Sequence, residues 1–347
     1  MKTLRVELQE RSYPVYIGRG AVLETAALLR AVSKAKRLVL ITDEHIASEH
    51  GLPLLHLLRE ADYEAYMFTV SAGEEAKTLA QYAALMEKLT ALQLQRSDAI
   101  LALGGGAVGD LAGFAAASLN RGVDLIVLPS TLLSQVDSAI GGKNGLNTAA
   151  GKNLVGTFYQ PKLVLIDPNY LDSLPLREKN SGMAEIIKYA LIGDEEMFRL
   201  LESCDAYRFP MESVIYRCCA MKAAFVAADE LDLSARRALN FGHTFGHAYE
   251  RAYGYSAYTH GEAVAAGMVQ MLRMQGAAEL VKRLETLLEK YDLPTRIDCL
   301  PETLAEGIRS DKKNTGESLT IGEVPSAGRC TLRETTVEEL LEGRESE

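Results

Sequence analysis

The feature that most constrains the fold is a change of pattern near the middle of the chain. Up to Asp167, short apolar and β-rich runs alternate with helical patterns, whereas almost only helical patterns follow Pro168. Strands that alternate with helices form a parallel sheet with helices on both of its faces. We therefore expect an α/β domain over residues 1–167 and an all-α domain over residues 168–347.

The predicted elements follow from the spacing of apolar residues. The expected strands cover residues 3–8, 13–17, 37–41, 65–70, 99–103, 123–128 and 162–166. The expected helices cover residues 21–30, 53–59, 78–92 and 111–119 in the first half and 176–192, 195–202, 211–229, 235–253, 262–274 and 277–291 in the second. A length of 347 residues suits two domains, because a domain usually has about 100 to 200 residues.

The charge balance limits the kinds of partner. With 37 basic and 47 acidic residues the formal net charge is −10, so neither nucleic acid nor an anionic membrane would attract the chain. An anionic ligand must therefore meet a local basic pocket. The five cysteines form no C-x-x-C pair, which indicates reduced thiols, and the first ten residues hold no apolar signal segment. We expect a cytoplasmic protein.

A glycine-rich turn follows one of the expected strands. Residues 99–103 run into Gly104-Gly105-Gly106-Ala107-Val108-Gly109-Asp110 and then into the helical pattern 111–119, which is the strand, turn and helix context of a G-x-G-x-x-G motif. Such glycines let the backbone approach a pyrophosphate, and the N–H groups at the helix start favour its negative charge. A tight turn without a ligand is the alternative.

Asp43 is a candidate acidic partner of this turn. It stands at the carboxyl end of the expected strand 37–41, where ligands of α/β sheets bind. The glycine turn follows a later strand than in the standard dinucleotide-binding unit, so the usual downstream acidic residue is not assumed. As an isolated residue, Asp43 could equally cap a helix that begins at Glu44.

Three of the six histidines fall close together in the helical half. His243 and His247 are four residues apart and so share one face of a helix, and His260 follows. Three imidazoles with a carboxylate could hold Zn²⁺ with one open coordination position, although an H-x-x-x-H pair is also common on an ordinary polar face. Glycines within Asn240–Glu250 indicate a close approach to its backbone.

Glu185 is the candidate carboxylate. It lies in the mostly apolar segment Gly182–Ala190, where a carboxylate is not expected to be buried without a partner. Lys188 stands three residues later, so a simple Glu–Lys pair on the protein surface is the alternative.

Several basic residues stand beside unusual segments of this acidic chain. Lys143 and Lys152 flank the glycine-bearing loop Gly141–Asn147, and the others are Arg121, Lys188, Lys222, Arg236, Lys312 and Lys313. Each by itself reads as a solvated side chain. If they converge, they could bind an anion, with lysine as a point charge and arginine as a bidentate fork.

Seven separated segments carry a family resemblance: Gly104–Asp110, Pro129–Ser138, Gly141–Asn147, Gly151–Asn153, Gly182–Tyr189, Leu239–Glu250 and His260–Val264. Over nearly its whole length the chain resembles the 3-dehydroquinate synthases. The resemblance implies a Rossmann-like NAD-binding α/β domain and an all-α C-terminal domain. It also implies a divalent metal ion, usually zinc with cobalt as an alternative, and a homodimer. The implied reaction converts 3-deoxy-D-arabino-heptulosonate 7-phosphate, a sugar phosphate, to 3-dehydroquinate and phosphate in the shikimate pathway.

The resemblance also assigns residues to roles, position by position. The implied metal ligands are Glu185, His243 and His260, which leaves His247 to face the substrate. The implied NAD residues are Asp43, Glu74, Lys77, Gly105, Gly106, Asp110, Ser130 and Thr131, with Lys143 and Lys152. The implied catalytic and substrate-binding residues are Arg121, Asp137, Lys143, Lys152, Asn153, Lys188, Lys222, Arg236, Asn240, His247 and Lys312, with Lys313 as the alternative to Lys312.

Some positions depart from the family pattern. Asn144 and Ser130 stand where threonine is usual, Asp232 stands where glutamate is common, and Asn314–Thr320 replaces a segment that usually holds an arginine. Related sugar-phosphate cyclases change the substrate-facing residues, whereas Arg236, Asn240 and His247 are retained here. The rival functions are another sugar-phosphate cyclase, a metal-dependent polyol or glycerol dehydrogenase, and a zinc-stabilised module without catalytic activity.

Overall fold

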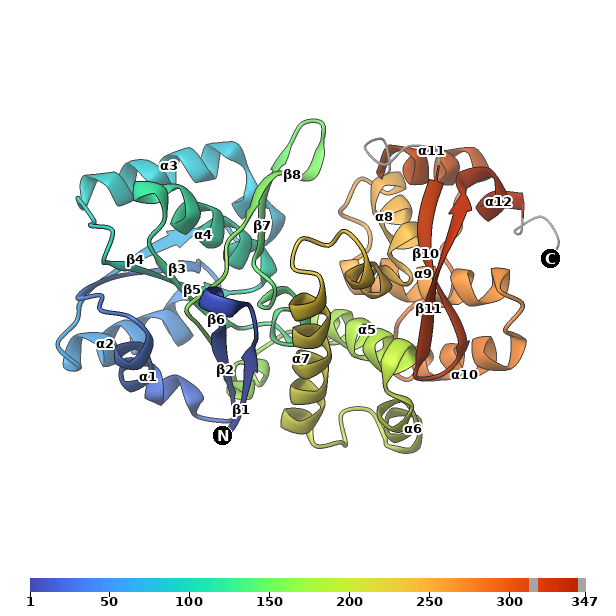
Figure 1. Ribbon diagram of the computed structural model, residues 1–347, viewed down its shortest axis with the longest axis horizontal. Coiled ribbons are helices and arrows are strands. Elements are labelled where there is room, and N and C mark those ends of the chain that lie inside the picture. Colours follow the sequence, from blue (N-terminus) through green and yellow to red (C-terminus); the bar gives the residue numbers. More distant parts are fainter. Residues whose placement is uncertain (312–317, 343–347) are drawn as a thin grey trace. The chain divides into compact units, whose positions relative to one another are not determined.

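The computed structural model describes residues 1–311 and 318–342 and divides into two compact units (Figure 1). The N-terminal unit holds Met1–Leu174 together with Ile215–Ala227. The C-terminal unit holds Pro175–Val214 and the described residues from Ala228 onward. No sequence pattern predicts that Ile215–Ala227 returns to the first unit, because the helical spacing of this segment is the same whichever core it joins.

The N-terminal unit is built on a seven-stranded sheet in the order β1-β2-β9-β6-β5-β3-β4. Its strands are β1 (Lys2–Val6), β2 (Tyr13–Ile17), β3 (Arg37–Asp43), β4 (Glu64–Val70), β5 (Ala99–Gly104), β6 (Asp124–Pro129) and β9 (Leu163–Ile166). The pairs are parallel except for β1, which runs antiparallel to β2. Each of the seven expected strand runs forms a strand, and the predicted α/β fold is confirmed.

Helices cover both faces of this sheet (Figure 1). They are α1 (Thr25–Val32), α2 (Leu52–Glu60), α3 (Leu79–Ala91) and α4 (Gly106–Ser118). Leu38 and Leu40 of β3 pack in one core with Leu54 and Leu58 of α2. The intervening residues of the strand are also fully buried, because successive side chains point to opposite faces. Burial on both faces explains why these strands read as continuous apolar runs.

The strand order contains a switch point between β3 and β5. From β3 the chain passes to β4 on one side, and β5 then returns to pair with β3 on its other side. Connections that leave in opposite directions open a crevice at the carboxyl ends of the two strands, and ligands of doubly wound sheets bind there. Asp43 ends β3 and Gly104 ends β5, so the predicted acidic residue and the glycine turn border this crevice.

The segment after Gly141 and Gly142 forms a hairpin. It consists of β7 (Lys143–Thr148) and β8 (Gly151–Phe158), which pair antiparallel and project from the N-terminal unit (Figure 1). The expectation of a loop over Gly141–Asn147 is therefore wrong from Lys143 onward. A Cβ atom on Gly156 would lie 2.2 Å from the carbonyl oxygen of Asn144, so the close pairing of the two strands requires glycine at this position.

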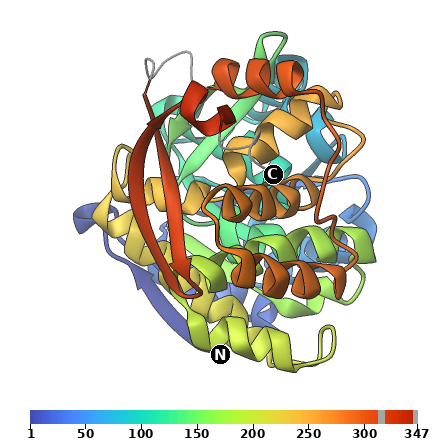
Figure 2. The same cartoon turned by 90° about the vertical axis from the view of Figure 1, so that its right-hand side faces the viewer.

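The C-terminal unit is mainly helical, but it is not all-α as expected, because a two-stranded hairpin joins its helices. The helices in this part of the chain are α5 (Leu176–Gly193), α6 (Glu195–Ser203), α7 (Met211–Ala228), α8 (His243–Ala252), α9 (His260–Met274), α10 (Ala278–Glu289), α11 (Pro301–Asp311) and α12 (Val337–Glu342). Most of α7 belongs to the N-terminal unit. An antiparallel hairpin of β10 (Ser318–Ser326) and β11 (Arg329–Thr336) adds to the helices and is the long red ribbon pair in Figure 2.

The expected helix over residues 235–253 is interrupted. A short 3-10 helix, η8 (Ala235–Asn240), precedes α8, and Gly242 separates them with a φ of 81°. A Cβ atom on Gly242 would lie 2.9 Å from the carbonyl oxygen of Val264, and one on Gly246 would lie 3.2 Å from the Val264 Cα. The close approach inferred from the glycines is therefore that of α9.

No helix within residues 1–311 and 318–342 combines the length and the apolar character that crossing a membrane requires.

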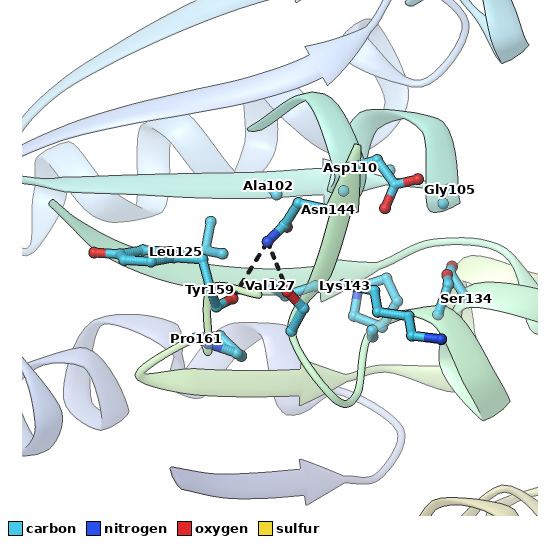
Figure 3. A pocket seen from close by; sticks show the side chains of 17 residues that line it. Ala102, Gly105, Asp110, Leu125, Val127, Ser134, Lys143, Asn144, Tyr159 and Pro161 are labelled. Carbon is cyan, nitrogen blue, oxygen red and sulfur yellow. Dashed lines mark hydrogen bonds between the residues drawn. The ribbon is translucent and has the colours of Figure 1, made fainter. Parts of the chain in front are cut away.

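Asn144 fastens the base of the β7–β8 hairpin to α4. Its Nδ2 donates to the carbonyl oxygens of Gly142 at 2.8 Å and Tyr159 at 3.5 Å (Figure 3). Its Oδ1 lies 1.6 Å from the point that a Cβ atom of Gly113 would occupy. The glycine in α4 therefore makes room for the asparagine that replaces the family's usual threonine.

Replacing Gly113 with alanine should lower the melting temperature of the protein. Alanine in a helix ordinarily gains up to about 1 kcal/mol over glycine. Here the new methyl group would overlap the Asn144 side chain and displace an amide whose partly buried hydrogen bonds contribute about 0.5–1.5 kcal/mol each. Gly109→Ala is the matched control, since nothing lies within 4 Å of its Cβ position in the same helix, and it should raise the melting temperature. Asn144→Ala should reduce the effect of Gly113→Ala; strictly additive losses would contradict this packing.

Candidate active site

The glycine turn brings several predicted NAD residues together at the crevice. Gly105 and Gly106, with Asp110 and Lys143, line one pocket (Figure 3). A Cβ atom on Gly105 would meet the Thr131 side chain at 3.0 Å, so this glycine is closely packed. Packing does not require Gly109, whose Cβ position has no neighbour within 4 Å. Gly109 thus leaves the start of α4 open to a ligand.

The strand beside the turn contributes Ser130 and Thr131. The N–H of Ser130 donates to the carbonyl oxygen of Gly104 at 2.9 Å, and the hydroxyls of Thr131 and Ser134 lie 2.8 Å apart. Both predicted NAD residues therefore lie at the carboxyl end of β6, next to that of β5. Asp43 lies one strand further, where its Oδ1 accepts the N–H groups of His45 at 2.9 Å and Ile46 at 3.3 Å.

Lys77 joins the predicted NAD site to the hairpin. It ends the 3-10 helix η4 (Gly73–Lys77), and its buried ammonium donates to Asp110 Oδ2 and to Asn153 Oδ1 at 2.5 Å each. Burial raises the pKa of Asp110, and the Lys77 charge opposes that rise. Glu74 of the same 3-10 helix accepts a hydrogen bond of 2.6 Å from Asn147 in β7. The structure thus brings predicted NAD and substrate residues into one network.

A second basic cluster lies in the same unit. The ammonium of Lys222 lies 2.8 Å from both the Oδ1 and the carbonyl oxygen of Asp137, and α7 carries Lys222 within the segment that belongs to the N-terminal unit. Lys143 begins β7, and Lys152 lies at the start of β8. Arg121 is not part of this cluster. It is exposed in the turn after α4, and its φ is 62°.

The predicted metal ligands converge in the C-terminal unit. Glu185 comes from the middle of α5, while His243 and His260 are the first residues of α8 and α9. The Oε1 of Glu185 lies 3.5 Å from the Nε2 of each histidine. Donors bound to one tetrahedral Zn²⁺ at about 2.1 Å lie about 3.4 Å apart. The carboxylate and the two imidazoles therefore fit a single zinc ion.

The pairing of Glu185 with Lys188 is buried. The Glu185 residue has 0% and Lys188 has 1% of its surface exposed, which excludes the surface pair considered above. The Lys188 ammonium contacts Oε2 of Glu185, whereas Oε1 faces the two histidines. One oxygen of the carboxylate thus faces the lysine, and the other faces the two histidines.

The surroundings shift the pKa values of the two predicted histidine ligands in opposite directions. Burial, with the nearby Lys188 ammonium, lowers the pKa of His243 to about 3, so its imidazole is neutral. Burial also acts to lower the pKa of His260, but contacts with Glu185 and Glu250 outweigh it and raise the pKa to about 10. The positive charge of a metal ion would take the place of this proton.

Glu250 is a buried acidic residue that the sequence analysis did not single out. Within the described part of the chain it forms a second group of potential ligands with His247 and His260. Its sequence signal is spacing, since residues 243, 247 and 250 fall on one face of α8. His247 itself lies beside His243, with their ring centres 5.4 Å apart.

Close packing of α9 on α5 places His260. A Cβ atom on Gly261 would lie 2.1 Å from the carbonyl oxygen of Ser181, one turn before Glu185. Thr259 and Glu262 form a capping box at the start of α9, and Arg177 of α5 donates to both oxygens of Glu262 at 2.8 Å. The first turn of α9 is therefore held against the helix that carries Glu185, the predicted carboxylate ligand.

Arg236 is held by the loop that precedes it. Asp229 accepts the backbone N–H of Arg236 at 3.2 Å and those of Leu233 and Ser234, and these bonds outweigh burial and lower the pKa of Asp229. The guanidinium of Arg236 donates to the carbonyl oxygen of Glu230 at 2.9 Å. Asp232, in the same loop, has a φ of 59°, which aspartate tolerates better than most residues. Asn240 is exposed at the end of η8.

Lys312 and Lys313 lie outside the described residues, so the structure does not test the predictions made for them.

Replacing Gly261 with alanine should weaken zinc binding by about tenfold or more, because the new methyl group would push α9 away from Ser181 and separate His260 from Glu185. Titration of the metal-free protein with Zn²⁺ against a chromophoric chelator measures this affinity. Gly109→Ala, in the other unit, should leave zinc affinity unchanged. Unaltered affinity in the Gly261 variant would contradict the proposed placement of α9.

Comparison with known proteins identifies the relatives of the chain. The family models described as 3-dehydroquinate synthase N-terminal and C-terminal match residues 67–181 and 182–314. A 3-dehydroquinate synthase from Clostridium beijerinckii is 40% identical, and the match covers 97% of this chain and 99% of that protein.

Solved structures agree with this relationship. The 2-epi-5-epi-valiolone synthase from Streptomyces hygroscopicus subsp. jinggangensis, with NAD⁺ and Zn²⁺ bound, superposes with a TM-score of 0.88 at 27% identity and 98% coverage of both chains. A 2-deoxy-scyllo-inosose synthase complexed with carbaglucose-6-phosphate, NAD⁺ and Co²⁺ gives 0.85 at 25% identity, covering 99% of this chain and 100% of that one. A probable glycerol dehydrogenase from Sinorhizobium meliloti, at 16% identity, a TM-score of 0.60 and coverage of 96% and 95%, shares the fold alone. The matches over almost the full length, together with the two family models, place this chain in the 3-dehydroquinate synthase family.

Proposed function

We propose that this chain is a 3-dehydroquinate synthase, a carbon–oxygen lyase acting on a phosphate. It converts 3-deoxy-D-arabino-heptulosonate 7-phosphate to 3-dehydroquinate and phosphate by transient oxidation, phosphate elimination, reduction, ring opening and aldol closure. This is a step of the shikimate pathway to the aromatic amino acids. The observation that carries the proposal is the group formed by the buried Glu185 and the partly buried His243 and His260, which fits one divalent ion in a chain whose relatives over nearly its full length are 3-dehydroquinate synthases.

The cofactors are NAD and a divalent metal ion, Zn²⁺ or Co²⁺. The metal ion would be held by Glu185, His243 and His260, and the dinucleotide by the residues at the carboxyl ends of β3, β5 and β6 and by Lys77. When bound, the ion supplies a Lewis acid for substrate hydroxyls, and NAD supplies a hydride acceptor that is regenerated within each turnover. Three protein ligands leave a coordination position for the substrate, which disfavours a closed structural zinc site.

The basic residues bind the two anionic groups of the substrate. An acidic chain attracts a carboxylate and a phosphate only where lysine and arginine side chains are concentrated. Lys152, Asn153, Lys188 and Arg236 position these anions, while His247 donates or relays a proton beside the metal ligands. The remaining assigned positions, Arg121, Asp137, Lys143, Lys222, Asn240 and Lys312, complete the substrate contacts.

The proposal includes the partner class and the location of the protein. A sugar phosphate is the substrate, as the carbaglucose-6-phosphate complex of a structural relative supports. All five cysteines are free thiols, which supports the reducing environment of the cytoplasm. We further propose a homodimer with no nucleic acid or membrane partner.

Phosphate release distinguishes this function from its rivals. With the heptulosonate phosphate and a catalytic amount of NAD⁺, the protein should release one phosphate per 3-dehydroquinate formed, without accumulation of NADH. A polyol dehydrogenase would instead accumulate NADH with a polyol, and another cyclase would act on a different sugar phosphate. Prior treatment with a chelator should abolish phosphate release, and added Zn²⁺ or Co²⁺ should restore it; chelator-resistant release would overturn the metal assignment.

Two substitutions separate metal binding from substrate binding. His243→Ala should remove zinc and activity together, because it deletes one of three ligands. Lys152→Ala should keep its zinc and lose about 10- to 100-fold in kcat/KM, the equivalent of one charge-assisted hydrogen bond. Zinc content and initial rates of both variants provide the comparison, and full zinc content in the His243 variant would refute its role as a ligand.

A further inference from the structure

Glu250 lies beside the metal ligands and has no role in the proposed function as described so far. The residue is only 5% exposed, so its carboxylate lies in surroundings where an ionised group needs compensating contacts. Its Oε2 lies 3.6 Å from the Nδ1 of His260. The other ring nitrogen of His260, Nε2, lies 3.5 Å from Oε1 of Glu185. The imidazole of His260 therefore stands between two carboxylates, with one nitrogen facing each.

The orientation of His243 shows the same division between its two nitrogens. The Nε2 of His243 lies 3.5 Å from Oε1 of Glu185, and its Nδ1 lies 3.3 Å from the carbonyl oxygen of Phe241. In both histidines Nε2 points to the shared carboxylate oxygen and Nδ1 points to another acceptor. A neutral imidazole has one N–H and one lone pair. A ring that binds a metal ion through the Nε2 lone pair therefore keeps its one N–H on Nδ1, where each of these two rings faces an acceptor.

We propose that Glu250 is a positioning residue for the metal site, with its carboxylate accepting the Nδ1–H of His260 and holding Nε2 toward Glu185. This inference rests on the proposed function only in that Glu185, His243 and His260 bind the ion. A carboxylate behind a histidine ligand fixes the ring orientation and increases its basicity, and loss of such a partner typically weakens metal binding by about 10- to 100-fold.

A second ion on Glu250 is the competing interpretation. The ligand atoms of His247, Glu250 and His260 also lie within 4.8 Å of one another. Both groups of ligands, however, include the same His260 ring. To bind two ions at once, that ring would have to lose both of its protons, whereas a neutral ring serves one ion through Nε2 and donates to Glu250 through Nδ1. One ion with Glu250 as support needs no such deprotonation.

The fold holds Glu250 where this role requires it. Glu250 follows His243 by seven residues, or about two turns of α8, so the helix presents both side chains on one face. Close packing at Gly246, whose Cβ position is 3.2 Å from the Val264 Cα, sets the separation of α8 from α9. His260 is the first residue of α9. The distance from Glu250 to His260 is thus determined by the packing of two helices.

The test measures metal affinity and not turnover. Metal-free wild type, Glu250→Gln and Glu250→Asp are titrated with Zn²⁺ against a chromophoric chelator at one pH. Glu250→Gln should bind zinc about 10- to 100-fold more weakly, and Glu250→Asp, which keeps the charge, should recover part of the loss. Glu202→Gln is the matched control, because Glu202 pairs with Arg283 in the same unit, and its affinity should equal that of wild type.

Cobalt substitution adds a measurement that should not change if Glu250 only stabilises the fold. The visible absorption bands of Co²⁺ in Glu250→Gln should shift relative to wild type, because the basicity and orientation of one ligand change, while circular dichroism should show the same fold. Zinc affinity and cobalt spectrum equal to those of wild type would overturn the proposal. Two equivalents of metal in wild type and one in Glu250→Gln would also overturn it in favour of a second ion.

Two further variants cover the cases in which Glu250→Gln does not fold or the ligand assignment itself is wrong. If Glu250→Gln does not fold, Glu250→Ala carries the test, and an affinity for zinc equal to that of wild type in this variant would overturn the proposal. His243→Ala reports separately on the proposed function, since retained zinc there would show that the ligand assignment itself is wrong. A normal loss of zinc in His243→Ala with no loss in Glu250→Gln would leave the function standing and remove only the role of Glu250.

Discussion

The C-terminal unit depends on one carboxylate buried in an apolar helix. Glu185 is fully buried in α5, where an ionised carboxylate without partners would be strongly destabilising. Lys188 of the same helix and the imidazoles of His243 and His260 provide its compensating contacts. Because these histidines begin α8 and α9, the need to stabilise one charge also determines how three helices pack. The same arrangement that satisfies the carboxylate creates a set of metal ligands.

Glycines give the helices the close approach that this arrangement requires. Gly261 lets α9 contact the backbone of α5 at Ser181, and Gly246 lets α8 contact α9 at Val264. The N-terminal unit uses the same device where Gly113 of α4 leaves room for Asn144 of the hairpin. The proposed metal ligands are thus placed by positions where a side chain is absent. A helical glycine lowers local stability by about 1 kcal/mol relative to alanine, and close packing offsets that cost.

Sequence patterns predicted some elements well and others poorly, for physical reasons. The strands of the central sheet are buried on both faces, so they stand out as apolar runs. The β7–β8 hairpin does not, because Leu154 and Val155 are exposed and backbone pairing holds its strands together. The helical period continues through Gly242, but its φ of 81° ends the helix there. Spacing alone could not place Glu185 and Lys188, since a pair three residues apart looks the same on a surface and in a core.

The sequence by itself determined the alternation of strands and helices, the glycine turn after β5 and the residue types able to bind a metal ion. These features are local, since they depend on periodicity and on the chemistry of single side chains. Only the tertiary structure decided that Glu185 shares one oxygen with two histidines from other helices, and that Glu250 lies behind one of them. Such contacts join residues far apart in the chain, and their distances depend on how closely the helices pack.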